Sequence, residues 1–302
     1  LSQRLPIPSR ISEIELCAWL TRAAPGDVLE YYRGFLGADL TPFANPMSPE
    51  ARAGLARTGA RDETPEFAGI SHYLEHMCFK GTAKRDWHEI SVAFDDMGST
   101  YNAFTSVDRT FYFGWVPKNA ITAQIELLAD MMRPALPEEE FKTEKNVILE
   151  EIAMSKDSLD HLAFDFLLER VFEGSSLAWP ILGYDKTVGD LTRDQLHAYY
   201  ERRYAPDNLM LIVSGNVDSQ EIIGTAERLC GGWKPSGTER NRTLPEIKIG
   251  AANQVVERFN QQIVALCYAA PGANHPMHET AQAAASILGG GNSRFFWNIV
   301  QT

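Results

Sequence analysis

The chain has few cysteines, fewer basic than acidic residues, and no long uninterrupted hydrophobic run. Its four cysteines are far apart and form no Cys-x-x-Cys pair, so we expect isolated small hydrophobic side chains rather than a disulfide framework. The 302 residues include 28 Lys and Arg against 40 Asp and Glu, a formal net charge of −12. This balance gives no electrostatic footprint for nucleic-acid binding. No stretch is long and apolar enough for a membrane span, so we expect a soluble protein.

One short segment, GISHYLEHMCFKGT at residues 69–82, concentrates side chains that suit catalysis. His72 and His76 would lie on one face of a helix, about one turn apart. Two imidazoles at that spacing suit one Zn²⁺, and Glu75 beside them would take a proton from a zinc-activated water. The order His-x-x-Glu-His is the inverted form of a zinc-peptidase motif. The same pattern also arises by chance on a solvated helix face, and a catalytic zinc site needs a third protein ligand.

A candidate third ligand lies on a second predicted helix, residues 137–157. Three glutamates load its first turn, which suits the positive end of the helix dipole. Glu144, Ile148 and Glu151 fall at i, i+4 and i+7 on one semi-apolar face, and Glu150 points elsewhere. A glutamate on a buried face needs a partner. The preference for Glu151 over Glu150 depends on this helical phase alone, and Glu144 shares the face.

These motifs together resemble the pitrilysin/insulinase family of inverted-motif zinc metallopeptidases, which includes mitochondrial processing peptidase and its bacterial relatives. The resemblance covers roughly residues 57–302. Besides Glu151 within EKNVILEEI, it rests on four segments in the family's order: GARDETPEFAGISHYLEHMCFKGT, GSTYNAFTSVDRTFYFGWVP, YYERRYAPDNLMLIVSGNV and LGGGNSRFFWNIVQ.

The resemblance implies roles for individual residues. It implies three zinc ligands: His72, His76 and Glu151. Glu75 would be the general base, and Glu144 matches a second family glutamate that supports the site. Asn102 and Ala103 match the edge-strand positions along which family members bind an extended substrate backbone.

The implied function is a zinc-dependent metalloendopeptidase that hydrolyses peptide bonds in extended or unfolded peptides. The alternatives are a non-catalytic structural or processing-complex subunit of the same family, and a zinc-binding fragment with little turnover. The implied partners are a peptide or unfolded protein substrate and a second half, joined in cis or supplied in trans as a partner subunit. The compartment is not legible, and we favour the bacterial cytoplasm or periplasm over the mitochondrial matrix.

Strand runs mixed with helices predict an α+β fold. The resemblance implies α/β sandwich domains of the clam-shell zinc-peptidase type, the first complete from about residue 57 and the second truncated. We expect a catalytic domain at 56–234, a linker at 235–250 and the start of a second, related domain at 251–302. Residues 1–55 read as an unassigned helical segment that does not match the family. The chain thus resembles about the first half to two-thirds of a full family chain.

Hydrophobic periodicity and turn residues place the remaining elements. Further helices are predicted at 86–98, 118–133, 159–173, 192–203 with Thr192 as N-cap, 218–230 and 277–288. Strands are predicted in TYNAFTS and RTFYFGWVP as a hairpin, in NLMLIVSGN as a buried strand, and in QVVERFN and QIVALCYAAP as a pair.

Overall fold

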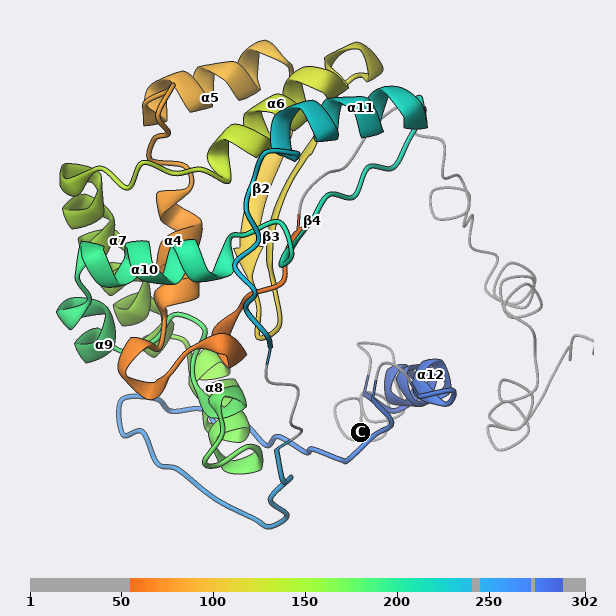
Figure 1. Cartoon of the computed structure of the whole chain (residues 1–302). Helices are drawn as coiled ribbons and strands as arrows, with labels where there is room; N and C mark the ends of the chain where they lie inside the picture. The colour runs from red at the N-terminus through yellow and green to blue at the C-terminus, as the bar shows by residue number, and fades with distance from the viewer. Residues whose placement is uncertain (1–54, 241–244, 273–274, 290–302) are drawn as a thin grey trace, which may run out of the picture. The chain divides into compact units, whose positions relative to one another are not determined.

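A computed structural model describes residues 55–240, 245–272 and 275–289 (Figure 1). Of the described residues, those from Leu55 to Leu266 belong to one compact unit, and those from Cys267 onward belong to another. Two segments lie outside the described residues, apart from residues 55 and 288–289. They are the helical segment predicted within residues 1–55 and the family-like segment LGGGNSRFFWNIVQ.

Helices contain far more of the described residues than strands do. In the first unit the α-helices are α4 (Ile70–Met77), α5 (Trp87–Asp96), α6 (Ile121–Met131), α7 (Glu138–Lys156), α8 (Leu159–Val171), α9 (Asp185–Asp190), α10 (Arg193–Arg203) and α11 (Ser219–Cys230). The second unit contains α12 (His278–Gly289). Short 3-10 helices are η1 (Ala60–Asp62), η2 (Pro65–Phe67), η3 (Lys118–Ala120) and η4 (Ser176–Ala178). The helices that we predicted in the described residues are confirmed, with ends shifted by a few residues.

Side-chain caps explain where two of these helices begin. Asp86 accepts a hydrogen bond from the Glu89 N–H at 2.8 Å at the start of α5. Thr192 does the same for α10, as predicted, accepting from the Gln195 N–H at 3.3 Å. In both helices the third residue reaches back to the backbone of the cap, which completes a capping box.

One antiparallel sheet of four strands lies beside the helices. Its strands are β1 (Leu55–Ala56), β2 (Thr100–Thr105), β3 (Thr110–Trp115) and β4 (Leu209–Met210), in the order β2-β3-β1-β4. The predicted hairpin of β2 and β3 is confirmed, with Thr105 opposite Thr110. In the described sheet, β2 is an edge strand, and its side chains alternate between an exposed and a half-buried face.

Helix α4 lies between the sheet and α7 (Figure 1). Its Tyr73, Leu74 and Met77 are completely buried. On α7, Ile148 and Ile152 belong to the same hydrophobic cluster, and the Tyr73 ring stacks on Phe141 with centroids 4.9 Å apart. This packing fixes the position of α4 relative to both neighbours.

The buried strand predicted in NLMLIVSGN is wrong. Only Leu209–Met210 form a strand, and Met210, Leu211 and Ile212 are each more than a third exposed. In the described sheet β4 pairs with β1, with Met210 opposite Leu55 and Leu209 opposite Ala56.

The strand pair predicted in QVVERFN and QIVALCYAAP is also wrong. Residues 251–270 contain no strand, and their apolar side chains, such as Val255 and Val264, are largely exposed. Alternating apolar residues favour a strand only when a neighbour supplies backbone hydrogen bonds and covers one face. The described residues supply neither here.

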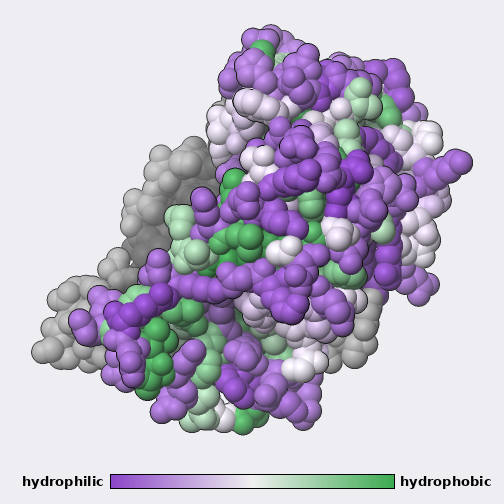
Figure 2. All heavy atoms as spheres, turned by 90° about the vertical axis from the view of Figure 1, so that its left-hand side faces the viewer, coloured by the Kyte–Doolittle hydropathy of each residue, from purple (hydrophilic) through white to green (hydrophobic). Residues whose placement is uncertain are grey.

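One face of the molecule is mainly hydrophilic. Figure 2, which views the side of Figure 1 on which α7 lies, shows mostly hydrophilic residues with hydrophobic ones scattered among them. Among the described helices, none combines the length and the hydrophobicity that a bilayer span requires.

The entry to α4 depends on a close backbone contact at Gly183, which gives a testable prediction. Gly183 has φ +75°, and a Cβ there would lie 2.2 Å from the Ala68 carbonyl oxygen. We expect Gly183→Ala to lower the free energy of unfolding by at least about 1–2 kcal/mol, because a side chain disfavours this conformation and meets Ala68. Chemical denaturation of the full chain measures the change.

Gly189→Ala is the matched control for this variant. Gly189 lies in α9, and a Cβ there meets nothing within 4 Å. Within a helix, alanine is more favourable than glycine by about 1 kcal/mol. The control variant should therefore have unchanged or higher stability. Equal stability of the two variants would contradict the contact at Gly183.

Candidate metal centre

Helix α4 places His72, Glu75 and His76 within five residues of one another. The two imidazoles lie one turn apart on the same face, with ring centroids 4.7 Å apart. Both rings are mostly buried, with side-chain exposures of 12% and 20%. The helix therefore holds two nitrogen donors side by side, as the spacing predicts.

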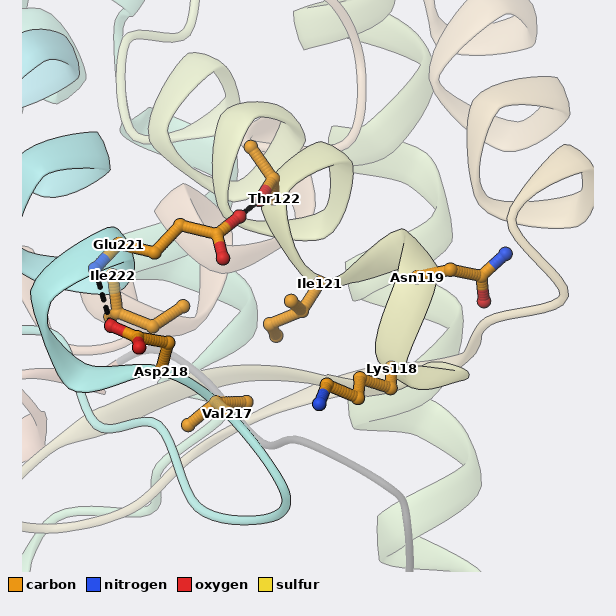
Figure 3. Close-up of a pocket in the computed structure, with 8 residues that line it drawn as sticks. All are labelled: Lys118, Asn119, Ile121, Thr122, Val217, Asp218, Glu221 and Ile222. Atoms are coloured by element: carbon orange, nitrogen blue, oxygen red, sulfur yellow. Dashed lines mark hydrogen bonds between the residues drawn. The ribbon is translucent and has the colours of Figure 1, made fainter.

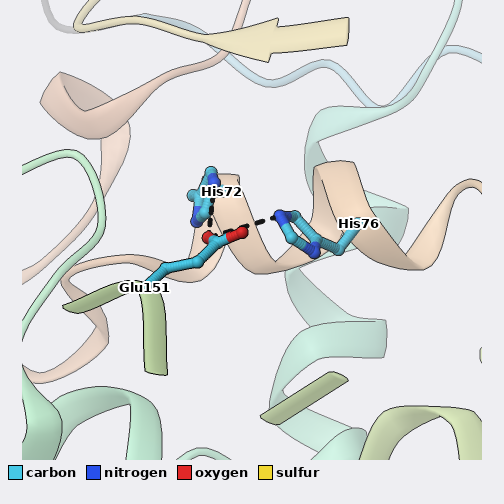
Figure 4. A group of neighbouring side chains, drawn as sticks. All are labelled: His72, His76 and Glu151. Atoms are coloured by element: carbon cyan, nitrogen blue, oxygen red, sulfur yellow. Dashed lines mark ion pairs between the residues drawn. The ribbon is translucent and has the colours of Figure 1, made fainter. Parts of the chain in front are cut away.

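Helix α7 brings a carboxylate to the same point (Figure 4). Glu151 Oε2 lies 3.7 Å from His72 Nε2 and 3.7 Å from His76 Nε2. Glu144, two turns earlier on α7, is buried, whereas Glu150 is exposed. Among the described residues, His72, His76 and Glu151 form a group in which one ligand atom from each lies within 4.8 Å of the others.

This arrangement fits a zinc ion. Zinc bonds of about 2.0–2.1 Å in tetrahedral geometry place neighbouring ligand atoms about 3.3 Å apart. The observed 3.7 Å separations are too long for hydrogen bonds, yet they need little contraction to reach that value. Two imidazoles and one carboxylate also match a donor set of catalytic zinc sites, which leaves a fourth position open.

A second carboxylate, from Glu144, orients His76 through the ring nitrogen that does not face Glu151. Glu144 Oε2 lies 2.9 Å from His76 Nδ1, and its Oε1 lies 2.7 Å from the Lys80 ammonium. Burial alone would raise the pKa of Glu144, but the bonds from His76 and Lys80 lower it below its usual value. For His76, burial works against the charged form, but Glu144 and Glu151 outweigh it and raise its pKa. A ring held at Nδ1 by a carboxylate presents Nε2 toward Glu151.

His72 has a different environment. Its Nδ1 is buried and has no hydrogen-bond partner among the residues that the structure describes. Burial, with a smaller contribution from His76, lowers the pKa of His72 to about 3. The ring is therefore neutral, which is the form that binds a metal.

Glu75 faces the edge strand β2 rather than α7. Its Oε2 accepts a hydrogen bond from the Thr105 hydroxyl at 2.6 Å. Burial raises the pKa of Glu75, and the Thr105 bond opposes part of that rise. The carboxylate is thus held next to the cluster but is not a member of it.

The two residues predicted to bind substrate lie on β2. Ala103 is half-buried against the core on the face that carries Thr105, and Asn102 is on the exposed face. The Asn102 amide oxygen accepts a hydrogen bond from the Ala103 N–H at 2.8 Å. Because this N–H is bonded to Asn102, it lies outside the ladder with β3 and points to the open edge.

Sequence reasoning missed Lys80 and Thr105. Thr105 lies two residues after Ala103, so strand alternation places both on one face, and this signal was available in TYNAFTS. Lys80 follows the end of α4, and no local pattern links it to Glu144 on α7. Its role depends on the packing of the two helices.

A separate pocket of about 420 Å³ lies between η3, the start of α6 and the start of α11 (Figure 3). It contains none of the residues discussed above. Two of its polar groups are already engaged: Thr122 donates to Glu221, and Asp218 caps α11. The metal cluster is therefore a better candidate for the functional site.

Comparison with known sequences agrees with the motif. Residues 44–185 match the profile of the insulinase family (peptidase family M16), and residues 190–302 match that of the peptidase M16 inactive domain. The chain belongs to this family, as the resemblance predicted. The first match includes His72, His76 and Glu151. The domain bounds predicted above stay a prediction.

Relatives carry related names. An uncharacterised zinc protease of Rickettsia felis is 35% identical over 248 residues, which are 81% of this chain and 60% of that protein. One of Bacillus subtilis is 39% identical over 190 residues, covering 63% of this chain and 46% of the relative. The chain therefore spans about half to three-fifths of the length of these relatives.

Solved structures share the fold. A protease from Helicobacter pylori superposes with a TM-score of 0.62 at 25% identity, covering 67% of this chain and 49% of that one. Pitrilysin gives a TM-score of 0.60 at 20% identity, covering 67% and 22%. These likenesses confirm the predicted α+β fold of the clam-shell peptidase type.

From this cluster we predict that the chain binds one zinc ion and that removal of a ligand side chain releases it. We expect His76→Ala to lose most of the metal, because one of three donors and the ring held by Glu144 both disappear. Elemental analysis of the purified chain after dialysis measures it. His161→Ala, which removes an exposed imidazole on α8, should keep the metal. Full retention of zinc by His76→Ala would contradict the assignment.

Proposed function

We propose that this chain carries the catalytic zinc site of a metalloendopeptidase that hydrolyses extended or unfolded peptides. The observation that carries the proposal is the meeting of His72, His76 and Glu151 at one point, with Glu75 beside them and outside the ligand set. The zinc-protease names of the relatives support the same chemistry.

In this proposal His72, His76 and Glu151 hold Zn²⁺. When bound, Zn²⁺ supplies Lewis-acid chemistry, since it lowers the pKa of a water to about 7 and polarises a carbonyl group. Glu144 keeps the His76 ring in the orientation and tautomer that present Nε2, and Lys80 balances the charge of Glu144.

Glu75 is the general base. Its carboxylate accepts a proton from the attacking water and returns it to the leaving amine. The hydrogen bond from Thr105 holds one carboxylate oxygen, so the other remains available for the proton. Thr105 also ties the base to β2, the strand along which we place the substrate.

The substrate is an extended peptide that adds to the open edge of β2. An edge strand offers unpaired backbone groups, so it binds many sequences with little dependence on their side chains. The peptide replaces Asn102 as the partner of the Ala103 N–H, and the freed Asn102 amide then donates to a substrate carbonyl. The half-buried Ala103 is small enough to allow a close backbone approach.

Turnover is proposed to need a second half, in cis or as a partner subunit. The chain spans about three-fifths of the Rickettsia felis relative. It also superposes on a structure described as the first half of the periplasmic protease PqqL from Escherichia coli, with a TM-score of 0.59. A non-catalytic subunit is the alternative, but such a subunit does not need the complete set of ligands and base that α4 and α7 carry.

Glu75→Gln separates the base from the ligands. Glutamine keeps the shape and the bond with Thr105 but accepts no proton, so we expect zinc to stay bound while peptide cleavage falls by about 10²–10⁴-fold. A quenched unfolded peptide reports cleavage, and elemental analysis reports zinc. Glu150→Gln, an exposed change on α7, should alter neither.

The same assay tests the second half. It is run on the chain alone and on the chain mixed with the C-terminal half of an M16 relative. A rate gained only in the mixture supports the need for a partner, and equal rates contradict it.

For the Glu75→Gln variant, loss of zinc would make Glu75 a ligand and overturn the roles of Glu75 and Glu151.

The edge-strand proposal predicts a binding defect in Asn102→Ala. Removing one hydrogen bond to the substrate should raise KM about three- to tenfold, with kcat and zinc content little changed. Steady-state cleavage of peptides of different sequence measures it. Asn119→Ala, an exposed change in η3, is the control. An unchanged KM would place the peptide away from this edge.

A further inference from the structure

The metal-bearing helix α4 begins without a cap from its own side chains. Its N-cap residue is Gly69, at φ +97°, and no side chain there accepts from the first turn. The first backbone N–H groups of a helix need an acceptor when they are buried. Helix α4 has only eight residues, and His72 is the third of them. A shift of the helix start would therefore move His72 as well.

Glu63 supplies the missing acceptors. Its Oε2 accepts from the Gly69 N–H at 2.8 Å, and its Oε1 accepts from the Ser71 N–H at 2.9 Å. The side chain is buried, with 7% of the residue exposed. One carboxylate therefore holds two points of the helix start, six and eight residues away along the chain, and the second point directly precedes His72.

The turn that carries Glu63 is itself anchored. The neighbouring Asp62 accepts from Arg240 Nε at 2.9 Å and from the Gly59 N–H at 3.1 Å, and it lies 3.4 Å from the Arg203 guanidinium. Asp62 and Arg203 are almost completely buried. Because the turn is fixed by α10 and by the segment that follows α11, Glu63 determines where α4 begins.

Ser71 provides a second link at the same point. Its hydroxyl lies 2.7 Å from the Tyr199 hydroxyl on α10, and Tyr199 in turn lies 3.0 Å from the Thr58 hydroxyl. The first turn of α4 is thus tied to two parts of the structure that carry no metal-site residue.

We propose that Glu63 is a positioning residue for the metal centre, whose carboxylate sets the rotation and depth of α4 at which His72 and His76 meet Glu151. The inference rests on the proposed zinc site and assigns it a support that lies outside the ligands. Glu144 orients one ring, whereas Glu63 orients the helix that carries both rings and the base.

The direct test is zinc affinity of the full chain with Glu63→Gln, measured by competition with a chelator at pH 8. Burial raises the pKa of Glu63 to about 7, so at pH 8 the wild-type group is the carboxylate. Glutamine has one acceptor oxygen and turns an N–H donor toward the other backbone N–H. Changes to groups that orient metal ligands weaken affinity by 10–100-fold, and we expect about tenfold here.

The spectrum of bound Co²⁺ gives a second measurement, which a loss of stability alone does not change. The visible absorption of Co²⁺ bound in the zinc site depends on ligand geometry, so Glu63→Gln should change its intensity or position in folded, fully loaded protein. Glu66→Gln changes an exposed glutamate three residues later and should leave both readouts unchanged. Asp86→Ala removes a cap of α5, which carries no metal-site residue, and should lower the melting temperature without altering metal affinity.

The outcomes separate the two proposals. If the wild-type chain binds neither metal, the zinc site itself fails. If it binds zinc and Glu63→Gln binds with the same affinity and the same cobalt spectrum, Glu63 has only a structural role and the present inference is overturned. Failure of Glu63→Gln to fold while Asp86→Ala folds would also overturn it, because Glu63 would then serve the whole fold.

Discussion

The candidate metal cluster depends on the packing of α4 against α7 in one rotational setting. The stacked rings of Tyr73 and Phe141 and the buried Ile148 bring the helices together. Glu144 and Glu151 then face the two histidines from either end of that contact. A rotation of α7 by one residue, about 100°, would turn Glu151 away and bring Glu150 toward His72. Apolar packing thus decides which carboxylate reaches the imidazoles.

Negative charge is concentrated near this contact. Three carboxylates, from Glu75, Glu144 and Glu151, approach two histidines in a mostly buried place. The negative charge of Glu144 is balanced by Lys80 and by His76, whose pKa is raised. One carboxylate oxygen of Glu75 accepts a hydrogen bond from Thr105. Among the described residues, Glu151 approaches the two histidines at 3.7 Å. A divalent cation there would give Glu151 and both Nε2 atoms a partner, which is the physical case for zinc.

Local pattern was enough to predict the helices and the hairpin. Residues at i, i+4 and i+7 on α7 placed Glu144, Ile148 and Glu151 on one face of that helix, and alternation in TYNAFTS predicted the two faces of β2. Both signals are contained within one element. For the order His-x-x-Glu-His, the repeat of a single helix was likewise enough to predict that both histidines lie on one face.

The failures concern contacts between elements, which no pattern within a single element specifies. NLMLIVSGN and QIVALCYAAP have strand-like composition, but a strand needs a neighbour, and composition says nothing about which neighbour is present. Lys80 and Glu63 were missed for the same reason: their roles exist only once α7 or the start of α4 lies beside them. Burial of a charged side chain, which would have identified Glu63, becomes visible only in the folded chain.

The central claim is that α4 and α7 together hold one zinc ion through His72, His76 and Glu151. Anomalous diffraction from crystals of the zinc-loaded chain, recorded on both sides of the zinc absorption edge, tests it most directly. We predict one anomalous peak about 2.0–2.1 Å from a nitrogen of each histidine and from a carboxylate oxygen of Glu151, with Glu75 outside bonding distance. A peak bonded to Glu75 instead of Glu151, or a zinc bound away from α4, would contradict it.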